Sequence, residues 1–396
     1  MQLSNRALNI QASPIRKLVP LANAAKAAGK HVYHLNIGQP DIETPKEMMK
    51  VYAEFDQKIL AYGPSQGLEF YRKNLVEYYS RYDIELNEDE IIVTTAGSEA
   101  CFFAMLAVCN SGDEIIIPEP FYTNYNGFAA WAGVKITPLT TNADNGFALP
   151  DNNQIEKLIS NNTKAIMICN PGNPTGAVYN KDELLRLAEL TKKHDIFLIS
   201  DEVYREFVYD GDSHTSILSL PDINDRAIVV DSISKRYSAC GARIGCIITH
   251  NQLLLGALIK FAQARLCPPT LEQYAANACI DLQGEYFDGI LTEYQSRRDL
   301  VFDALKKIDD VICVKPKGAF YIIAKLPVDD AEHFVKWLLT EYSVNNETVM
   351  VAPAAGFYAT PGFGKNEIRI AYILNKSDLK KAMEIFSSGL IEYLNR

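Results

Sequence analysis

The sequence predicts an α/β protein in which helices cover a mostly parallel sheet, together with a smaller α+β domain. Two observations carry this prediction. Between about residues 90 and 250, short and almost continuously apolar runs alternate with segments of helical spacing, as in buried parallel strands linked by helices. After about residue 285, strand-like runs and helical segments mix without that regular alternation.

Six strands are expected in the first part, because each is an apolar run bounded by polar or turn-forming residues. They span 90–95, 114–117, 164–169, 196–200, 227–231 and 244–249. Pro118 is expected to end the second of them, and helical spacing predicts helices over 99–108 and 182–193.

The second part begins with a long helix that has a charged face, over 286–308. Further strands are expected over 311–314, 319–323, 348–351 and 367–372, and helices over 331–341 and from 377 onward. No Gly/Ser-rich linker intervenes, so a continuous helix is expected to join the domains. The predicted division is an N-terminal arm with part of the small domain (1–45), a large domain (46–285) and a small C-terminal domain (286–396).

Length and composition agree with this class. At about 150 residues per domain, 396 residues correspond to two or three domains. A hydrophobic content of 48% with 22% charged residues excludes disordered and collagen-like chains. The net charge of −10 disfavours a nucleic acid or an anionic membrane as the main partner, but it permits a local basic pocket.

The cysteines and histidines suggest no metal or disulfide chemistry. The eight cysteines include no CxxC pair, and the six histidines form no recognisable ligand set. Free thiols in a reducing cytosol are therefore expected. Met1–Pro20 lacks the pattern of a signal peptide, and no apolar run reaches the roughly 18 residues of a spanning helix. We expect a cytoplasmic protein without a metal, nucleic-acid or membrane partner.

Four loops after predicted strands carry chemistry-bearing residues, at the sheet edge where open α/β sheets bind ligands. Ala96-Gly97-Ser98 exposes backbone N–H groups at a helix start, a natural phosphate seat or simply a tight turn. The segment 170–176, Asn-Pro-Gly-Asn-Pro-Thr-Gly, is a rigid turn that could orient an amide. Neither GxGxxG nor the P-loop motif occurs.

The other two loops carry charge. Ser200-Asp201-Glu202-Val203-Tyr204 places an acid directly after an apolar strand, either as a helix cap or as a carboxylate that stabilises a cation. Asp231-Ser232-Ile233-Ser234-Lys235 is followed by Arg243, and two hydroxyls with two cations could hold a dianionic phosphate. Taken alone, Lys235 would be an ordinary surface charge.

In combination and in this order, these segments resemble the fold-type-I, class I/II aminotransferases, which use pyridoxal 5′-phosphate (PLP). The resemblance covers nearly the whole chain. Its further motifs are Asn36-Ile37-Gly38-Gln39-Pro40-Asp41, Tyr62-Gly63-Pro64-Ser65-Gln66-Gly67 with Arg72, Gly318-Ala319-Phe320-Tyr321, and Arg369. It implies the PLP-transferase fold, with a seven-stranded, mostly parallel sheet in the large domain and a smaller α+β domain.

The resemblance also implies a role for each catalytic residue. Lys235 would form the Schiff base with PLP and later move the substrate proton in a ping-pong aldimine/ketimine mechanism. Asp201 would pair with the protonated pyridine nitrogen, which makes the ring an electron sink. Tyr204 and Asn173 would hydrogen-bond the phenolic oxygen of the ring, and Tyr122 would stack on its face; a core aromatic is the plain alternative for Tyr122.

By the same resemblance, hydroxyls, backbone amides and one arginine would hold the cofactor phosphate. These residues are Ala96, Gly97, Ser98, Ser232, Ser234 and Arg243. Tyr62 would reach the phosphate of a neighbouring subunit, so a homodimer with shared active sites is implied. Arg369, placed within an apolar strand, would bind the substrate α-carboxylate as a bidentate fork, and Gly38 would leave room for the substrate.

The substrate side chain is less clearly assigned. One aspartate aminotransferase subgroup reads the distal carboxylate with a lysine at the position of Ser98, and another with an arginine of the partner subunit shortly before a Pro-Pro turn. Arg265, which precedes Leu266-Cys267-Pro268-Pro269, matches the second device or is an interface arginine. We therefore favour transfer from aspartate to 2-oxoglutarate.

Three alternatives remain open at this stage. A broad-specificity aromatic or methionine aminotransferase is the nearest, since Tyr33, Tyr62 and Phe357 could form an apolar wall. A PLP-dependent β-lyase or synthase shares the scaffold and needs no oxo-acid acceptor. A PLP-sensing regulator is disfavoured, because 45 residues are too few for a winged helix with its linker and the acidic chain does not suit DNA.

Overall fold

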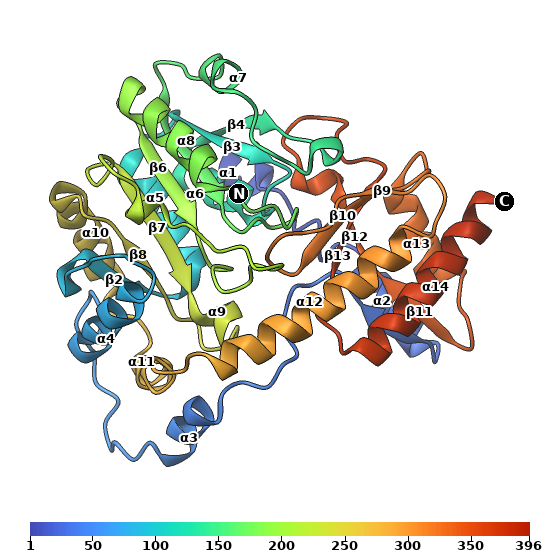
Figure 1. Cartoon of the computed structure of the whole chain (residues 1–396), viewed down its shortest axis with the longest axis horizontal. Helices are drawn as coiled ribbons and strands as arrows, with labels where there is room; N and C mark the ends of the chain where they lie inside the picture. Colours follow the sequence, from blue (N-terminus) through green and yellow to red (C-terminus); the bar gives the residue numbers. More distant parts are fainter.

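The computed structural model describes residues 1–396, apart from the side chain of Asn9. In the described chain, the main sheet has seven strands (Figure 1). Their spatial order is β2 (Ile91–Thr94), β8 (Gly245–Ile248), β7 (Ala227–Ser232), β6 (Phe197–Asp201), β5 (Thr163–Cys169), β3 (Glu114–Glu119) and β4 (Lys135–Thr140). The strands from β7 to β4 are parallel, while β8 is antiparallel to both of its neighbours. The predicted fold class is confirmed.

Alternating residues of the central strands face two separate cores. In β6, Leu198 packs into one core and Ile199 into the other, and both are fully buried. One core is formed with α4 (Glu69–Ser80), α8 (Lys181–His194) and α11 (Thr270–Asn277). The other is formed with α5 (Ala96–Val108), α6 (Asn124–Ala132) and α10 (Gln252–Arg265). Burial on both faces explains the near-continuous apolar runs.

The sheet differs from the prediction at its β3–β4 edge. β3 continues through Pro118 to Glu119, because β5 pairs only with its first half, so the missing N–H of proline breaks no ladder there. β4 was not predicted. It pairs with β3 along its whole length, yet its residues are mostly half-exposed and include Pro138, so the sequence carries no apolar run.

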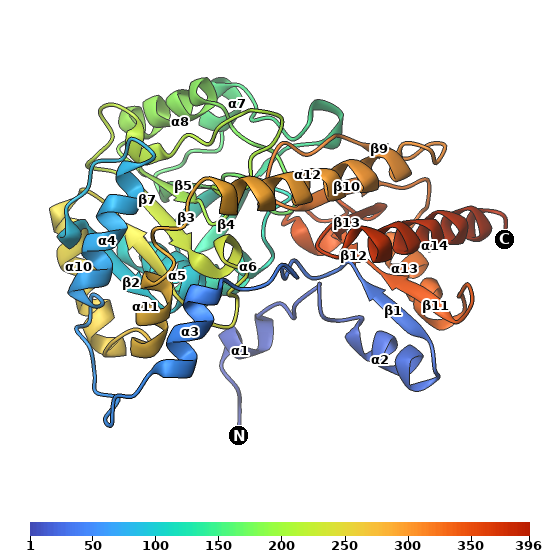
Figure 2. The same cartoon turned by 60° about the horizontal axis from the view of Figure 1, so that its bottom comes forward.

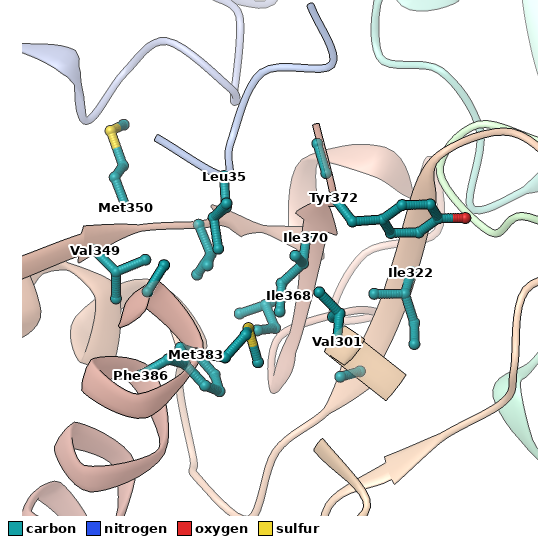
Figure 3. Packing of buried hydrophobic residues seen from close by; sticks show 14 of the residues in the cluster. Leu35, Val301, Ile322, Val349, Met350, Ile368, Ile370, Tyr372, Met383 and Phe386 are labelled. Atoms are coloured by element: carbon teal, nitrogen blue, oxygen red, sulfur yellow. The ribbon is translucent and has the colours of Figure 1, made fainter. Parts of the chain in front are cut away.

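The long helix α12 (Glu285–Leu305) leads out of the large unit toward the C-terminal part (Figure 2). There a second sheet has the order β12 (Ala352–Pro353), β13 (Glu367–Ala371), β10 (Tyr321–Lys325) and β9 (Ile312–Cys313). It packs with α13 (Ala331–Thr340) and α14 (Lys376–Leu394) around a core that includes Ile322, Ile370 and Phe386 (Figure 3).

The N-terminal region joins this second unit. β1 (His31–His34) pairs in parallel with β11 (Glu347–Met350), and α2 (Val19–Ala27) lies against α13. On this basis we propose the domain division 1–45, 46–285 and 286–396. The remaining helices are α1 (Asn5–Asn9), α3 (Lys46–Glu54), α7 (Asn152–Glu156) and α9 (Ile233–Arg236). Short 3-10 turns occupy Glu88–Glu90, Ala143–Asn145, Ile217–Ser219 and Ala354–Phe357.

Among the described helices, none has the combination of length and apolar character needed to cross a bilayer.

Candidate active site

A cavity of about 400 Å³ opens between the carboxyl ends of the central strands and the C-terminal unit. Asp201 ends β6, Ser232 ends β7, and Asn173 lies in the turn after β5. Three of the predicted loops therefore meet at this cavity. The predicted residues that line the cavity are Gly38, Ala96, Gly97, Ser98, Tyr122, Asn173, Asp201, Tyr204, Ser232, Ser234, Lys235, Arg243 and Arg369.

Asp201 is a buried carboxylate without a cationic partner among the described residues. The hydroxyl of Tyr125 donates to its Oδ2 at 2.7 Å, and the backbone N–H of Val203 donates to Oδ1 at 3.4 Å. Burial dominates over these hydrogen bonds and raises the pKa of Asp201 to about 6. A carboxylate kept in this setting is suited to bind a positively charged ligand atom.

Arg369 presents the opposite case, a buried cation without a carboxylate among the described residues. Its Nη1 donates to Oδ1 of Asn173 at 3.0 Å, its Nη2 donates to the carbonyl of Asn36 at 2.5 Å, and its Nε has no partner. The residue is 1% exposed, and burial lowers its pKa below the ordinary value. An anion entering the cavity would supply the missing charge.

A chain of hydrogen bonds continues from Arg369 across the cavity wall. Nδ2 of Asn173 donates to the hydroxyl of Tyr204 at 3.3 Å, and the hydroxyls of Tyr204 and Tyr321 lie 2.9 Å apart. Burial raises the pKa of Tyr204 well above its ordinary value, so its phenol keeps its proton. The wall therefore offers donors at fixed positions between Arg369 and the strand ends.

The amine of Lys235 reaches into the same cavity. Its Nζ donates to the carbonyl of Gly38 at 2.9 Å and lies 3.6 Å from Sγ of Cys240. Gly38 has to be glycine, because an added Cβ would come 1.9 Å from the hydroxyl oxygen of Tyr321. Because the 36–39 segment packs closely against Tyr321, the carbonyl of Gly38 is free to accept the hydrogen bond from Nζ of Lys235.

Hydroxyl groups and one arginine gather where α5 begins. Oγ of Ser232 and Oγ of Ser234 lie 2.8 Å apart, and Arg243 is exposed with one bond, from Nη1 to the carbonyl of Cys240 at 2.9 Å. The first turn of α5 passes so close to β8 that a Cβ on Gly245 would lie 2.7 Å from the nitrogen of Gly97. A helix start beside hydroxyls and a guanidinium is a typical phosphate site.

The charged residues that line the cavity are mostly cations. Among the described residues they are Arg16, Lys235, Arg243 and Arg369, against the single carboxylate Asp201. The chain as a whole carries −10, so this excess of positive charge is local. The cavity is built to bind ligands with several negative charges.

The family model described as aminotransferase class I and II matches residues 30–386, which include all three sheets and every cavity residue except Ser13, Ile15 and Arg16. This chain is a class I/II aminotransferase. The family is PLP-dependent, and the donor set just described fits that cofactor: a buried carboxylate for a ring cation, an amine, and a phosphate seat.

This aminotransferase is similar to relatives of more than one named specificity. The putative aminotransferase YugH of Bacillus subtilis is 34% identical over 96% of both chains. The aspartate aminotransferase of Pyrococcus abyssi is 32% identical over 99% of both. The solved structure of the alanine aminotransferase of Pyrococcus furiosus superposes with a TM-score of 0.91 at 32% identity, covering 99% of this chain and all of that one. The substrates in the names of these two relatives, aspartate and alanine, differ.

Two predicted residues of the aminotransferase do not line the cavity of their own chain. Tyr62 is 81% exposed on the segment between α3 and α4. Arg265 ends α10, where its Nη2 donates to the carbonyls of Ser65 at 3.0 Å and Val93 at 3.3 Å, and its Nη1 lies 3.5 Å from Glu99. A role of Tyr62 or Arg265 in the cavity of a neighbouring subunit therefore stays a prediction.

Several residues of the site were not assigned a role from the sequence. Tyr321 was quoted only as part of a motif, although it stands at the centre of the tyrosine pair; Tyr125 follows the Pro-Phe-Tyr segment by three positions and holds Asp201. Both carry a recognisable signal, a tyrosine close to a motif. Arg16 carries none, because a cation in a Pro-containing arm looks like an ordinary solvated charge.

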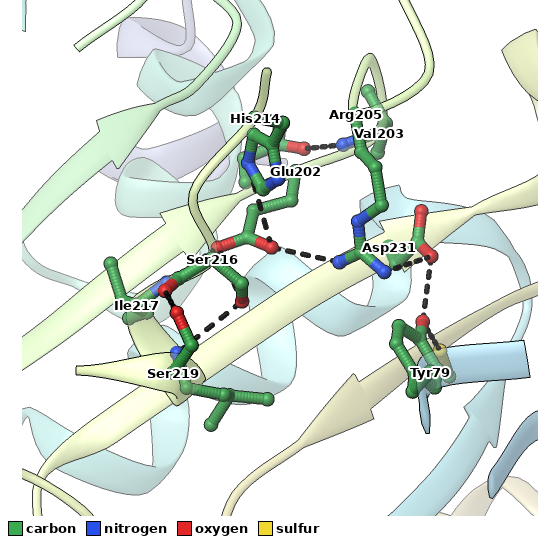
Figure 4. Close-up of polar contacts among 12 residues, drawn as sticks. Tyr79, Glu202, Val203, Arg205, His214, Ser216, Ile217, Ser219 and Asp231 are labelled. Atoms are coloured by element: carbon green, nitrogen blue, oxygen red, sulfur yellow. Dashed lines mark hydrogen bonds and ion pairs between the residues drawn. The ribbon is translucent and has the colours of Figure 1, made fainter. Parts of the chain in front are cut away.

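A buried polar network lies behind the site and ties β6 to β7 (Figure 4). Arg205 pairs with Glu202 at 2.7 Å, and its Nη1 lies 3.9 Å from Oδ2 of Asp231. Asp231 also accepts from the hydroxyl of Tyr79 at 2.6 Å and from Nη2 of Arg236 at 2.5 Å. These side chains are almost fully buried. Because Glu202 follows Asp201 and Arg236 follows Lys235, the network fixes the backbone that carries both cavity residues.

Proposed function

We propose that this aminotransferase uses PLP to move an amino group from an L-amino acid, with aspartate favoured, to 2-oxoglutarate. The observation that carries the proposal is Arg369, a buried guanidinium that lacks a carboxylate partner and faces a cavity rich in positive charge. An α-carboxylate is the group that this fork fits.

The cofactor would be held by residues that already share the cavity. Lys235 would bind its carbonyl carbon and Asp201 its ring nitrogen, while Ser232, Ser234, Arg243 and the first turn of α5 would hold its phosphate. When bound, PLP supplies an electron sink next to the substrate α carbon. The raised pKa of Asp201 supports this pairing, because a cationic partner would restore the charged form that burial disfavours.

The remaining steps belong to side chains of this chain. Arg369 orients the substrate through its α-carboxylate, with Asn173 and Asn36 fixing the plane of the guanidinium. Once the amino group of the substrate has taken the place of Lys235 on the cofactor, the freed Nζ would remove the proton from the substrate α carbon and later return one. Because the amino acid and the oxo acid both need Arg369, they occupy the cavity in turn, which is a ping-pong order.

Two further parts of the proposal concern the assembly and its location. Ile59, Leu60 and Tyr62 are 77%, 63% and 81% exposed on one short segment, an apolar surface that suits contact with a second subunit. We propose a homodimer in which Tyr62 reaches the partner's cofactor phosphate. The eight cysteines are all free among the described residues, which fits a reducing, cytoplasmic compartment.

Product analysis tests the reaction class. With aspartate and 2-oxoglutarate, the holoenzyme should form glutamate in step with loss of aspartate, and ammonia should stay at the level of a control without enzyme. Ammonia release from an amino acid without an acceptor would instead support a β-lyase. Faster transfer from tyrosine or methionine than from aspartate would favour the broad-specificity alternative. The wall expected for that alternative was wrong, because Tyr33, Tyr62 and Phe357 do not line the cavity; the aromatic residues that line it are Tyr122, Phe128 and Tyr321.

A further inference from the structure

We propose that Arg16, on the N-terminal arm, binds the side-chain carboxylate of a dicarboxylic substrate. This inference rests on the proposed function and deepens it, since it names the residue that selects the substrate class. The arm segment 11–18 precedes α2 and lies outside the three sheets.

The first observation is a charge without a partner. Arg16 lines the cavity together with Ser13 and Ile15, and its side chain makes no hydrogen bond or ion pair with the described residues. Of the other three cavity cations, Lys235 is the proposed cofactor lysine, Arg243 belongs to the proposed phosphate seat, and Arg369 suits the α-carboxylate. Arg16 is therefore the cation left over for a second carboxylate.

The second observation is how the arm is tied to the α-carboxylate site. Nδ2 of Asn36 donates to the carbonyl of Ile15 at 3.2 Å, and the carbonyl of the same Asn36 accepts from Nη2 of Arg369 at 2.5 Å. The residue next to Arg16 is thus connected to Arg369 through one asparagine. Arg16 and Arg369 line the same cavity.

The third observation is that the arm segment is anchored on both sides of Arg16. Nδ2 of Asn126 on α6 donates to Oε1 of Gln11 at 3.0 Å, Ile15 packs against the cluster around Phe357, and Lys17 pairs with Glu332 on α13. Fixing the backbone lowers the entropy cost of presenting Arg16 to a ligand. The planar guanidinium then suits bidentate binding of a carboxylate.

Arg265 competes poorly for this role. Its Nη2 donates to the carbonyls of Ser65 and Val93, and its Nη1 lies 3.5 Å from Glu99, while Nε and Nη1 make no hydrogen bond. Serving a partner's cavity would require breaking the ion pair with Glu99 and the two bonds of Nη2. Arg16 needs no such exchange.

The test compares dicarboxylic and monocarboxylic ligands in the holoenzyme, using Arg16→Gln, Arg16→Lys and the matched control Arg6→Gln, which removes an exposed charge from α1 on the same arm. We measure kcat/KM for aspartate and alanine, and binding of unreactive succinate and propionate by calorimetry. Arg16→Gln should weaken aspartate turnover and succinate binding about 10- to 100-fold and change alanine and propionate less than about 2-fold. Arg16→Lys should be intermediate, and Arg6→Gln should match the wild type.

Equal losses for both ligand classes, or no loss of succinate binding in Arg16→Gln, would overturn the inference. A selective loss of succinate binding in Arg265→Gln, with none in Arg16→Gln, would overturn it in favour of Arg265. Failure of the proposed function would give a different result. The wild type would then transfer no amino group from any donor, while the succinate measurement would still decide the role of Arg16.

Discussion

At the scale of single residues, the site is marked by two buried charges that the folded chain leaves uncompensated. Asp201 and Arg369 stand on different strands, β6 and β13, and neither has an ion-pair partner among the described residues. Burying an unpaired charge destabilises a fold, so such groups are found where a ligand completes the pair. Here the ring nitrogen of the proposed cofactor and the α-carboxylate of the substrate would complete the two pairs.

Asp201 makes a pH-dependent prediction for the cofactor-free protein. Its pKa is raised to about 6 in the folded state, above its ordinary value of about 4, so between these pH values the folded state binds more protons. Its contribution to stability is therefore complete below pH ~4 and is lost as the pH rises toward ~6. Relative to Asp201→Asn, the wild type should lose up to about 3 kcal/mol of unfolding free energy across this range.

Urea unfolding of both cofactor-free proteins between pH 4.5 and 7 measures this difference. Other titrating groups are common to the two proteins and cancel. Parallel pH profiles would show that Asp201 titrates at its ordinary pKa and is not a carboxylate whose pKa is raised by burial.

At the scale of elements, the phosphate seat depends on how closely α5 approaches β8. A Cβ at Gly245 would lie 2.6 Å from the carbonyl carbon of Ala96 and 2.7 Å from the nitrogen of Gly97, both backbone atoms that cannot simply rotate away. Gly245→Ala should displace the first turn of α5, raise the Kd for PLP at least about 10-fold and cost about 1–3 kcal/mol of stability.

Gly256→Ala is the matched control, because a Cβ at that position in α10 meets no atom within 4 Å. It should leave the affinity for PLP unchanged and stabilise the helix slightly. A cofactor titration followed by absorbance measures both variants. Equal affinities for PLP in Gly245→Ala and Gly256→Ala would show that phosphate binding does not depend on the close approach of α5 to β8.

The elements also show what a sequence can predict here and what it cannot. Central strands and amphipathic helices were predictable, because burial on one or two faces imposes an apolar pattern, as in β6 and α8. The edge strand β4 was not predicted, since a half-exposed strand has no such pattern. Within the site, residues in motifs such as Asp201 and Lys235 were found, whereas Arg16 was not, because its place beside the cavity depends on how the arm folds back.

At the scale of the whole molecule, the apolar segment around Tyr62 predicts a dimer. Sedimentation equilibrium should give twice the chain mass of 44.2 kDa. Charges at the exposed positions, Ile59→Asp with Leu60→Asp, should shift the protein toward the monomer and weaken PLP binding, because Tyr62 would no longer reach a partner. Ile391→Asp on α14, also an exposed apolar residue, is the control and should leave the mass unchanged.

A monomeric wild type with full affinity for PLP would contradict the shared site. A dimer that persists in the Ile59→Asp, Leu60→Asp variant would mean that subunits meet through another surface.

The measurement that tests the central claim most directly is the absorption spectrum of the purified holoenzyme during addition of L-aspartate and then of 2-oxoglutarate. The account predicts that a band near ~420 nm gives way to one near ~330 nm with the amino acid and returns with the oxo acid, as PLP alternates between its aldehyde and amine forms. Lys235→Ala should lack the ~420 nm band of the lysine-bound cofactor. An unchanged spectrum with every donor, or a ~420 nm band that survives in Lys235→Ala, would contradict the assignment of the cofactor and its lysine.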